Sequence, residues 1–334
     1  MRKGVLAAGN WIVDRVKCID RWPGEGNLCS ILSEELAPGG GPANVLFDLA
    51  AMDPDYPLWA AGRIGGDADG DYLLAETAKR GIDGSLLLRT PGVPTSYTDV
   101  MSGPSSRTFF HAPGANARLS AADFGAVSND AEFFYLGYLL LLPLLDAPDP
   151  ECGTCAAKLL RLMRERGYRT VVDFVSGNPA GFRPAAEAAL PHTDLLIANE
   201  VEAGGATGIE LRRGDALAKE RLPEALKRLL AMGVGELAVI HFPEGAAALT
   251  RDGAYALTPS CRIRREEVAG HNGAGDAFAA GFLCAVARRL PLDTALRVGS
   301  ASSYFNLKSP TASGGAVPFF RIEEHLKSCE FGLL

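Results

Sequence analysis

The sequence contains no apolar run long enough to cross a membrane. The nearest candidate, residues 133–145, is interrupted by Pro143 and is shorter than the roughly 18 residues that a membrane-spanning helix needs. The first residues carry two cations before an apolar stretch, as a signal peptide does, but Asn10 and Asp14 break that stretch. We therefore predict a first strand here, and no membrane as a partner.

An excess of positive charge is also missing. The chain has 33 lysine and arginine residues against 40 aspartate and glutamate residues, which gives a net charge of −7. A protein that binds nucleic acid needs a basic surface to neutralise phosphates, and this composition argues against one. We therefore expect no nucleic acid among the partners.

Cysteine is present but lacks the arrangement of a disulfide framework. The seven cysteines are odd in number and irregular in spacing, which indicates reduced thiols and a cytoplasmic protein. Cys152 and Cys155 form one CxxC pair, but no second pair or nearby histidine completes a zinc site. We expect no metal at this pair.

Short apolar runs alternate with amphipathic stretches along most of the chain. This alternation is typical of βαβ units, in which helices cover both faces of a mostly parallel sheet. With 334 residues and 47% hydrophobic content, the chain can form one large core. We expect strands at 4–10, 56–65, 132–138, 170–175, 195–199 and 236–242, and helices at 41–52, 70–81, 155–167, 224–233 and 277–290.

Two segments do not follow the alternation. Residues 15–37 have no helical period, and residues 94–111 contain β-branched and aromatic runs on either side of a Gly-Pro turn, as a hairpin does. We interpret both as a small β-sheet inserted into the α/β body. A sheet held over the strand ends would act as a lid on a substrate.

A single aspartate stands at the head of the last predicted helix. Asp276 follows Gly273, Ala274 and Gly275, so only small side chains surround the first backbone N–H groups of that helix. Such N–H groups, together with the helix dipole, make a site for an anion such as phosphate. From this stretch alone, Asp276 is either a helix cap or a base that takes a proton beside the anion.

Three motifs, taken together, favour the base over the helix cap as the role of Asp276. "GGGPAN" (39–44), "NEVE" (199–202) and "GHNGAGDAF" (270–278) closely resemble the signatures of the ribokinase-like (PfkB-type) carbohydrate kinases, in the same order. The resemblance covers nearly the whole chain and includes segments 60–83 and 113–120. It implies a three-layer α/β/α sandwich, as one domain over 1–334, with a small β-sheet lid. It also implies an enzyme that transfers the γ-phosphate of ATP to a hydroxyl of a sugar or sugar-like molecule.

The resemblance assigns catalytic roles to the last two motifs. Asp276 would be the general base, and Gly273, Ala274 and Gly275 would offer N–H groups to the phosphoryl oxygens. Glu202 would act on Mg²⁺ through water, since magnesium prefers oxygen ligands and keeps several waters. Taken alone, the "NEVE" stretch favours a capped helix start, and its place in the order of the three motifs favours the metal role.

Two further groups of residues are predicted to hold the substrates. Polyols are bound by carboxylates and amides, and glycines allow close approach to the backbone. The predicted acceptor site comprises Asn10, Asp14, Gly40, Gly41, Asn44, Arg107 and Asn116, although a surface role for Arg107 and a purely structural role for Asn116 remain open. The predicted nucleotide site comprises Asn199, His241, Gly245, Asn272 and Ser302, with Ser303 beside it.

The sequence departs from the family pattern at two places. Gly270 stands where relatives carry an aspartate that helps to bind a monovalent cation, so we do not expect potassium activation. The segment "VIHFPEGA" (239–246) replaces a glycine-rich loop near the nucleotide, and His241 replaces a small hydroxyl residue. ATP would then sit differently, or another donor would be used.

Alternative functions remain at this point. A nucleoside kinase on the same fold would need aromatic rings around a base, for which Trp11, Trp22 and Tyr97 are candidates. A non-catalytic binding protein on the kinase scaffold is motivated by the altered nucleotide segments. A dehydrogenase is disfavoured because the glycines after the first strand do not form G-x-G-x-x-G. Open edges of the lid sheet suggest a homodimer.

Overall fold

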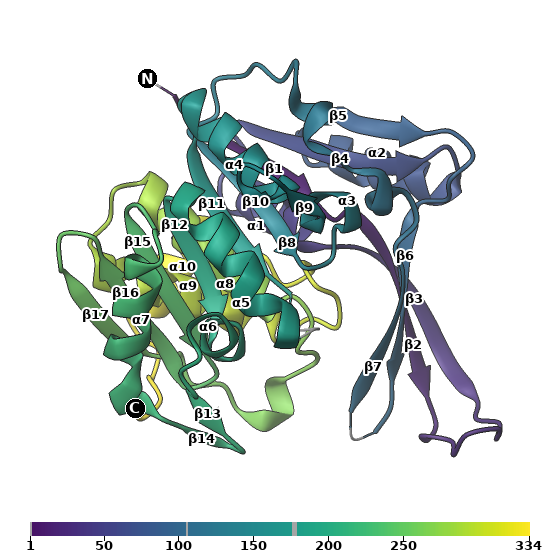
Figure 1. The fold of residues 1–334 in the computed structure, drawn as a ribbon. Coiled ribbons are helices and arrows are strands. Elements are labelled where there is room, and N and C mark those ends of the chain that lie inside the picture. Colours follow the sequence, from purple (N-terminus) through teal and green to yellow (C-terminus); the bar gives the residue numbers. More distant parts are fainter. Residues whose placement is uncertain (1, 105, 176–178) are drawn as a thin grey trace.

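The central feature of the fold is a large mixed β-sheet (Figure 1). The computed structural model describes residues 2–104, 106–175 and 179–334; Ser105, in the predicted hairpin turn, lies outside this range. Within the described residues the sheet has nine strands in the order β17-β16-β15-β12-β11-β8-β1-β4-β5. The pairs from β5 to β15 are parallel, and β16 and β17 are antiparallel. These strands are β1 (Val5–Gly9), β4 (Leu58–Gly65), β5 (Asp83–Thr90), β8 (Phe133–Leu139), β11 (Arg169–Phe174), β12 (Leu195–Asn199), β15 (Leu237–Phe242), β16 (Gly245–Thr250) and β17 (Tyr255–Pro259).

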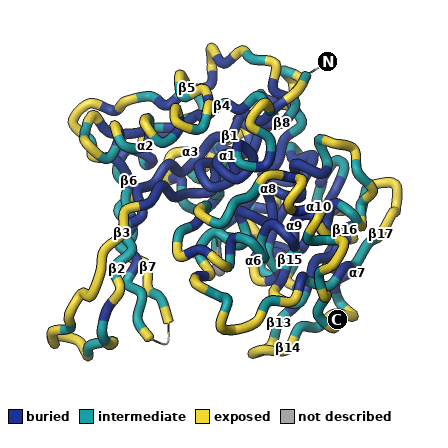
Figure 2. The backbone as a smooth tube through the Cα atoms, turned by 180° about the vertical axis from the view of Figure 1, so that it is seen from behind, coloured by how far each residue is buried: buried dark blue, intermediate teal, exposed yellow. Residues whose placement is uncertain are grey.

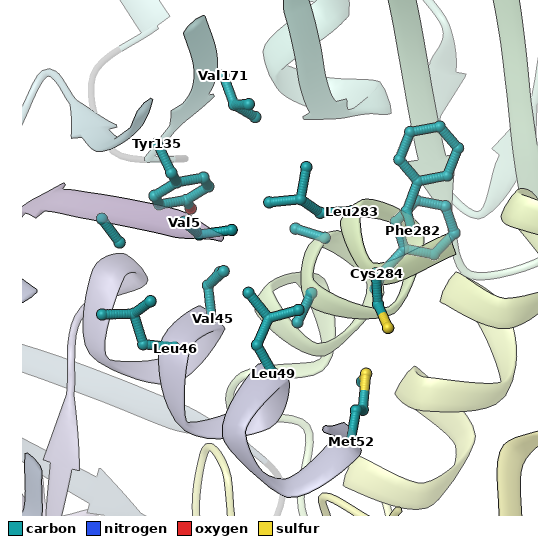
Figure 3. Packing of buried hydrophobic residues seen from close by; sticks show 14 of the residues in the cluster. Val5, Val45, Leu46, Leu49, Met52, Tyr135, Val171, Phe282, Leu283 and Cys284 are labelled. Carbon is teal, nitrogen blue, oxygen red and sulfur yellow. The ribbon is translucent and has the colours of Figure 1, made fainter. Parts of the chain in front are cut away.

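Helices cover both faces of this sheet. One hydrophobic core lies under α1, α8, α9 and α10, where Val45 and Leu49 of α1 and Leu283 of α8 meet Val5 and Tyr135 of the sheet (Figure 3). A second core on the opposite face lies under α4, α5, α6 and α7. The helices are α1 (Gly41–Met52), α2 (Ala68–Lys79), α3 (Pro143–Asp146), α4 (Cys155–Glu165), α5 (Pro179–Ala189), α6 (Glu200–Thr207), α7 (Leu222–Ala231), α8 (Ala274–Ala287), α9 (Leu292–Asn306) and α10 (Phe319–Leu326).

A four-stranded sheet projects from this body (Figure 1). Its order is β3-β2-β6-β7, in which β2 pairs antiparallel with β3 and parallel with β6, and β6 and β7 form the predicted hairpin. The far end of this sheet is largely exposed, whereas its root is buried against the body (Figure 2). We call these four strands the lid: β2 (Ile12–Ile19), β3 (Ile31–Gly39), β6 (Ser96–Ser102) and β7 (Arg107–Ala112). Two-stranded ribbons β9–β10 (Pro148–Asp149, Gly153–Thr154) and β13–β14 (Arg212–Arg213, Ala216–Leu217) lie elsewhere.

The predicted fold class is confirmed, with differences near the C-terminal end. The predicted helix over 41–52 is observed with the same bounds, because its apolar residues and Pro42 in the first turn are consistent with a buried helix. The strand expected at 236–242 is observed as β15, which forms a hairpin with β16; β16 and α9 were not predicted. Alanine-rich β16 has little β-propensity of its own and is held by pairing with both neighbours.

Parallel strands bring their C-terminal ends to one edge of the sheet. Asn10 follows β1, Tyr138 lies at the end of β8, and Asn199 ends β12. In sheets of this kind ligands bind beyond these strand ends. Among the described residues, no helix is both long and apolar enough to cross a membrane.

Candidate active site

A cavity of about 560 Å³ lies between the root of the lid and the C-terminal strand ends. We call it the acceptor cavity. Lid residues form one wall and the start of α8 forms another. The lining includes Asp14, Gly40, Asn44, Thr98, Phe109, His111, Tyr138, Asp173, Asn199, Glu202, His241, His271, Asn272, Gly273, Ala274, Gly275 and Asp276. Most of the predicted site residues are therefore brought together here.

Asp276 lies in this cavity and is 5% exposed. The Tyr138 hydroxyl lies 2.7 and 2.8 Å from its two carboxylate oxygens and donates to them, and Asn44 Nδ2 donates to Oδ2 at 2.8 Å. Burial raises the pKa of Asp276 to about 6, although these two donors oppose the rise. A carboxylate that is fixed in place and has a raised pKa is suited to accept a proton near neutral pH. Tyr138 was not predicted from the sequence.

The start of α8 depends on two glycines. Gly273 precedes the helix with φ of 73°, and a Cβ at this position would lie 2.7 Å from the carbonyl carbon of Ala312. A Cβ on Gly275 would lie 3.2 Å from the His241 ring. Gly273, Ala274 and Gly275 themselves place no larger side chain over the first N–H groups of α8, which have no acceptor within the helix, and all three residues line the cavity. The predicted anion site is sterically open in the structure.

Two acids face Asp276 across the acceptor cavity. Asp173, at the end of β11, accepts a hydrogen bond from Tyr135 at 3.0 Å. Burial first, and then the negative charges of Glu202 and Asp276, hold the pKa of Asp173 well above its usual range. Glu202 also accepts a hydrogen bond from the Asn199 backbone at 2.9 Å in a capping box. The "NEVE" motif therefore caps a helix, as one interpretation predicted, and Glu202 also lines the cavity.

Asp14 lies at the root of the lid, and the glycine turn makes room for it. Burial raises its pKa to about 7, and Asn272 Nδ2 donates to its carboxylate at 3.3 Å. A Cβ on Gly39 would lie 2.6 Å from Asp14 Cγ. Gly40, with φ of 90°, passes close to the Asn10 backbone, and Gly41 lies under the Tyr138 ring. The three glycines thus make room for Asp14, the Asn10 backbone and Tyr138, and Gly40 also lines the acceptor cavity.

Two predicted acceptor ligands have other roles in the structure. Asn10 accepts from the Tyr138 backbone at 2.6 Å and donates to the Leu141 carbonyl at 3.0 Å. Asn116 bonds both backbone groups of Trp11. Both amides are fully buried and lie outside the cavity lining, and their hydrogen bonds hold the backbone behind the cavity walls.

The lid contributes polar and aromatic groups that were not predicted. Thr98 Oγ1 and His111 Nδ1 lie 3.0 Å apart, and Nε2 of His111 has no hydrogen-bond partner within the described structure. Phe109 lines both the acceptor cavity and a neighbouring cavity of about 470 Å³. Arg107 lines that second cavity together with His271 and Asn272, which places it beside the anion site.

A further cavity of about 520 Å³ lies on the other side of the α8 start, and we call it the donor cavity. It includes the predicted nucleotide residues Asn199, His241 and Gly245. Its remaining wall is mostly apolar, as suits a planar base. The two cavities share Asn199, His241, His271, Ala274 and Gly275, so they meet at the anion site.

Three residues predicted for the nucleotide site differ in their surroundings. Ser302 lies outside the lining of the donor cavity, and its hydroxyl donates to the Val298 carbonyl within α9 at 2.9 Å, whereas Ser303 lines that cavity. Asn272 lies on the acceptor side, against Asp14. His241 is stacked on Phe278, and burial lowers its pKa to about 4, so it is neutral and cannot offer a positive charge to a phosphate.

Comparison with known proteins agrees with this geometry. Residues 5–318 match the model of the pfkB family carbohydrate kinases. A 5-dehydro-2-deoxygluconokinase of Clostridium perfringens is 24% identical over 86% of this chain and 83% of its own length, and an adenosine kinase of Schizophyllum commune is 25% identical over 78% and 76%. The ribokinase of Arabidopsis thaliana, solved with ribose and ATP, has a TM-score of 0.79 at 22% identity and covers 98% of this chain and 100% of its own.

The chain belongs to the pfkB family of carbohydrate kinases. It has the ribokinase-like fold and is a carbohydrate kinase by family. The resemblance seen in the three sequence motifs is thereby confirmed.

Proposed function

We propose that this chain transfers the γ-phosphate of ATP to a hydroxyl of a sugar or sugar-like molecule bound in the acceptor cavity. The observation that carries the proposal is that two cavities meet at the open start of α8, with Asp276 on the acceptor side. A reaction between two bound substrates needs such a shared point, because positioning supplies much of the rate of phosphoryl transfer.

The chemistry assigned to Asp276 is proton removal. As the acceptor oxygen forms its bond to the γ-phosphorus, the bond from phosphorus to the bridging oxygen breaks, ADP leaves, and the hydroxyl proton passes to Asp276. Tyr138 and Asn44 hold the carboxylate in place through their hydrogen bonds. The N–H groups from Ala274 onward stabilise the negative charge on the phosphoryl oxygens.

The carboxylates in the wall of the acceptor cavity fit a hydrated divalent cation, which we take to be Mg²⁺. Glu202 and Asp173 both line the acceptor cavity, and the charge of Glu202 helps to raise the pKa of Asp173. An acidic pair of this kind supplies the oxygen ligands that magnesium prefers, directly or through water. When bound, the ion would neutralise phosphate charge.

The positions of the three aromatic residues predicted to enclose a base favour a sugar over a nucleoside as acceptor. Trp11 is fully buried and its indole donates to the Ala61 carbonyl at 2.9 Å, so it cannot enclose a base. Trp22 and Tyr97 are likewise absent from the described lining of the acceptor cavity. Asp14 and the unpartnered Nε2 of His111 offer hydrogen bonds to sugar hydroxyls instead.

The structure also supports independence from a monovalent cation. Gly270 offers no side-chain ligand, and a Cβ there would lie 2.8 Å from the Ser309 carbonyl oxygen and 3.0 Å from an Arg107 nitrogen. The positive guanidinium of Arg107 therefore stands beside this position. We propose that Arg107 supplies positive charge next to the phosphates or the substrate.

Two further properties belong to this proposal. Exposed apolar side chains on the lid, among them Ile31, Leu32 and Phe110, support a homodimer formed through this sheet. Seven free cysteines support a location in the reducing cytoplasm.

The test is ADP release with Mg-ATP across ribose, fructose, gluconate derivatives and adenosine. The experiment compares the wild type with Asp276→Asn, which keeps the shape of the side chain but cannot act as a base. We expect turnover of a sugar and a loss of about 10²–10⁴ in kcat for the variant. A matched control is Asp55→Asn, at an exposed acid that lies outside the three motifs and outside the linings of both cavities.

The same assay distinguishes the alternatives. Turnover of adenosine alone would make this protein a nucleoside kinase. A sugar that raises Tm without any ADP release would indicate a binding protein or another donor. Equal turnover by the wild type and Asp276→Asn would overturn the assignment of the base.

A further inference from the structure

A group of metal-ligand side chains lies outside the active site, near the C-terminal end. Cys261 follows β17, His325 lies in the last turn of α10, and Cys329 comes one helical turn later. The Cys329 amide donates to the His325 carbonyl at 2.8 Å, which keeps these two residues on the same side of the chain. The pair of cysteines is separated by 68 residues in sequence.

Backbone pairing brings the two cysteines together. Cys261 forms an antiparallel bridge with Phe331. The Arg262 amide donates to the Glu330 carbonyl at 2.8 Å, and the Gly332 amide donates to Ser260 at 2.9 Å. Cys261 is further held by the Ser300 hydroxyl, which accepts from its amide at 2.8 Å. Backbone hydrogen bonds therefore fix the positions of these residues relative to one another.

The spacing of the ligand atoms fits one shared metal ion. One ligand atom from each of the three residues lies within 4.8 Å of the others, and the two sulfurs are 3.7 Å apart. Two zinc–sulfur bonds of about 2.3 Å at a tetrahedral angle place the sulfurs about 3.8 Å apart. A disulfide bond would require about 2.0 Å. The observed separation matches thiolates on one ion more closely than a bonded pair.

The histidine supplies an independent indication. Its Nε2 is buried and has no hydrogen-bond partner within the described structure. The ring is fixed by stacking on Tyr304, with centroids 4.1 Å apart, and by an edge contact with Phe305 at 5.2 Å. Burying an imidazole nitrogen without a hydrogen-bond partner costs free energy, and coordination of a metal ion by the ring would offset that cost.

We propose that Cys261, His325 and Cys329 bind a thiophilic divalent cation of the Zn²⁺ class. Two thiolates and one imidazole suit zinc, whereas Mg²⁺ and Ca²⁺ require oxygen ligands. His325 and Cys329 are only half buried, which leaves the fourth position to a water molecule. This is the one group of three such ligands found among the described residues.

The site joins the C-terminal segment to a wall of the donor cavity. Cys261 and Tyr304 line that cavity, and His325 stacks on Tyr304. A bound ion would cross-link residues 325–329 to residue 261 and so stabilise this wall. The metal site itself does not depend on the proposed kinase function, because its ligands take no part in the phosphoryl transfer.

The test uses the full chain, reduced with a phosphine and stripped of metal, and titrated first with Co²⁺ and then with Zn²⁺. We expect a thiolate-to-cobalt charge-transfer band together with the visible bands of tetrahedral Co²⁺, both lost when Zn²⁺ displaces the cobalt. Metal analysis should give one zinc per chain, and zinc should raise Tm. Cys329→Ser should lose the band and the zinc-dependent rise in Tm.

A second variant and a matched control keep the test decisive. His325→Gln should weaken the tetrahedral bands, while Cys155→Ser, a half-buried cysteine in the unrelated CxxC pair, should behave as the wild type. The proposal is overturned if reduced wild-type protein shows no thiolate band, or if the band survives in Cys329→Ser. It is also overturned if reduced protein binds no zinc and peptide mapping after oxidation shows a Cys261–Cys329 disulfide, since the pair would then be a redox site.

Discussion

At the scale of single residues, the chemistry of this kinase depends on how burial changes the acidity of carboxyl groups. Asp14, Asp48, Asp173 and Asp276 all have raised pKa values, and desolvation is the largest cause in each case. The negative charge of Asp276 adds to the rise at the other three. Only Asp276 combines a modest rise with two hydrogen-bond donors, which is the combination that a general base near neutral pH requires.

The pKa of Asp276 predicts the pH dependence of catalysis. As a base it must be ionised, so kcat/KM should fall about tenfold per pH unit below its pKa of about 6. Tyr138 donates to this carboxylate and lowers its pKa, so Tyr138→Phe should move the acid limb to higher pH. The pH profiles of kcat/KM for both proteins check this. An unchanged limb in Tyr138→Phe would contradict the assignment, and it would point to Asp14, with a pKa of about 7, as the titrating group.

The buried carboxyl group of Asp48 should make the stability of the protein depend on pH. Both of its carboxylate oxygens are buried without hydrogen-bond partners in the described structure, and burial, followed by the charge of Asp276, holds its pKa well above the usual 3.8. Because the folded-state pKa is above the unfolded one, the free energy of unfolding should fall as pH rises from about 4 through the folded pKa.

Asp48→Asn removes this ionisation. Its gain in the free energy of unfolding over the wild type should be at least about 1 kcal/mol larger at pH 8 than at pH 4, since one unit of pKa corresponds to about 1.4 kcal/mol. Urea unfolding of both proteins at the two pH values measures the difference. Asp55→Asn, at an exposed site, serves as the control. A gain that is equal at both pH values would show that packing, not charge, is responsible.

At the scale of elements, the end of β3 and the start of α1 connect the lid to the active site. Gly39 ends β3, and a Cβ there would lie 2.6 Å from Asp14 Cγ on the neighbouring strand β2. Gly39→Ala should therefore displace the Asp14 carboxylate and break its contact with Asn272. We expect KM for the acceptor to rise roughly tenfold, about 1.4 kcal/mol, with a smaller change in kcat.

Gly66→Ala is the matched control for this substitution, because a Cβ at Gly66 would meet no atom within 4 Å. Steady-state kinetics at saturating ATP measure both variants. If Gly39→Ala leaves KM unchanged, Asp14 does not bind the acceptor. If kcat falls as much as kcat/KM, Asp14 acts in the transition state instead.

At the scale of the whole molecule, the lid carries an apolar surface that the body does not cover. Leu32 is 65% exposed and Ile31 is 52% exposed, both on the edge strand β3. Edge strands with exposed apolar side chains are sites of association. Leu32→Glu should therefore convert the proposed dimer to a monomer in size-exclusion chromatography with light scattering.

Leu144→Glu, at a 42% exposed position on α3 outside the lid sheet, should leave the assembly unchanged. A wild-type protein that is monomeric at micromolar concentration would contradict the prediction. So would a dimer that survives Leu32→Glu.

The sequence by itself determined the local features of this protein. The α/β alternation, α1, the β6–β7 hairpin and the open start of α8 before Asp276 all follow from periodicity, turn residues and small side chains. These features depend on neighbours along the chain, so they are readable without a structure. The three motifs then indicated the family correctly.

Only the tertiary structure decided which side chains meet. Tyr138, Asp173 and His111 were missed because each lies in a segment of ordinary strand composition, and only strand order brings them to one cavity. The rotation of α9 turns Ser302 into the helix interface and Ser303 toward the donor cavity. The Cys261, His325 and Cys329 cluster likewise depends on a pairing between distant segments. Contacts of this kind arise from packing across the fold, which local sequence patterns do not encode.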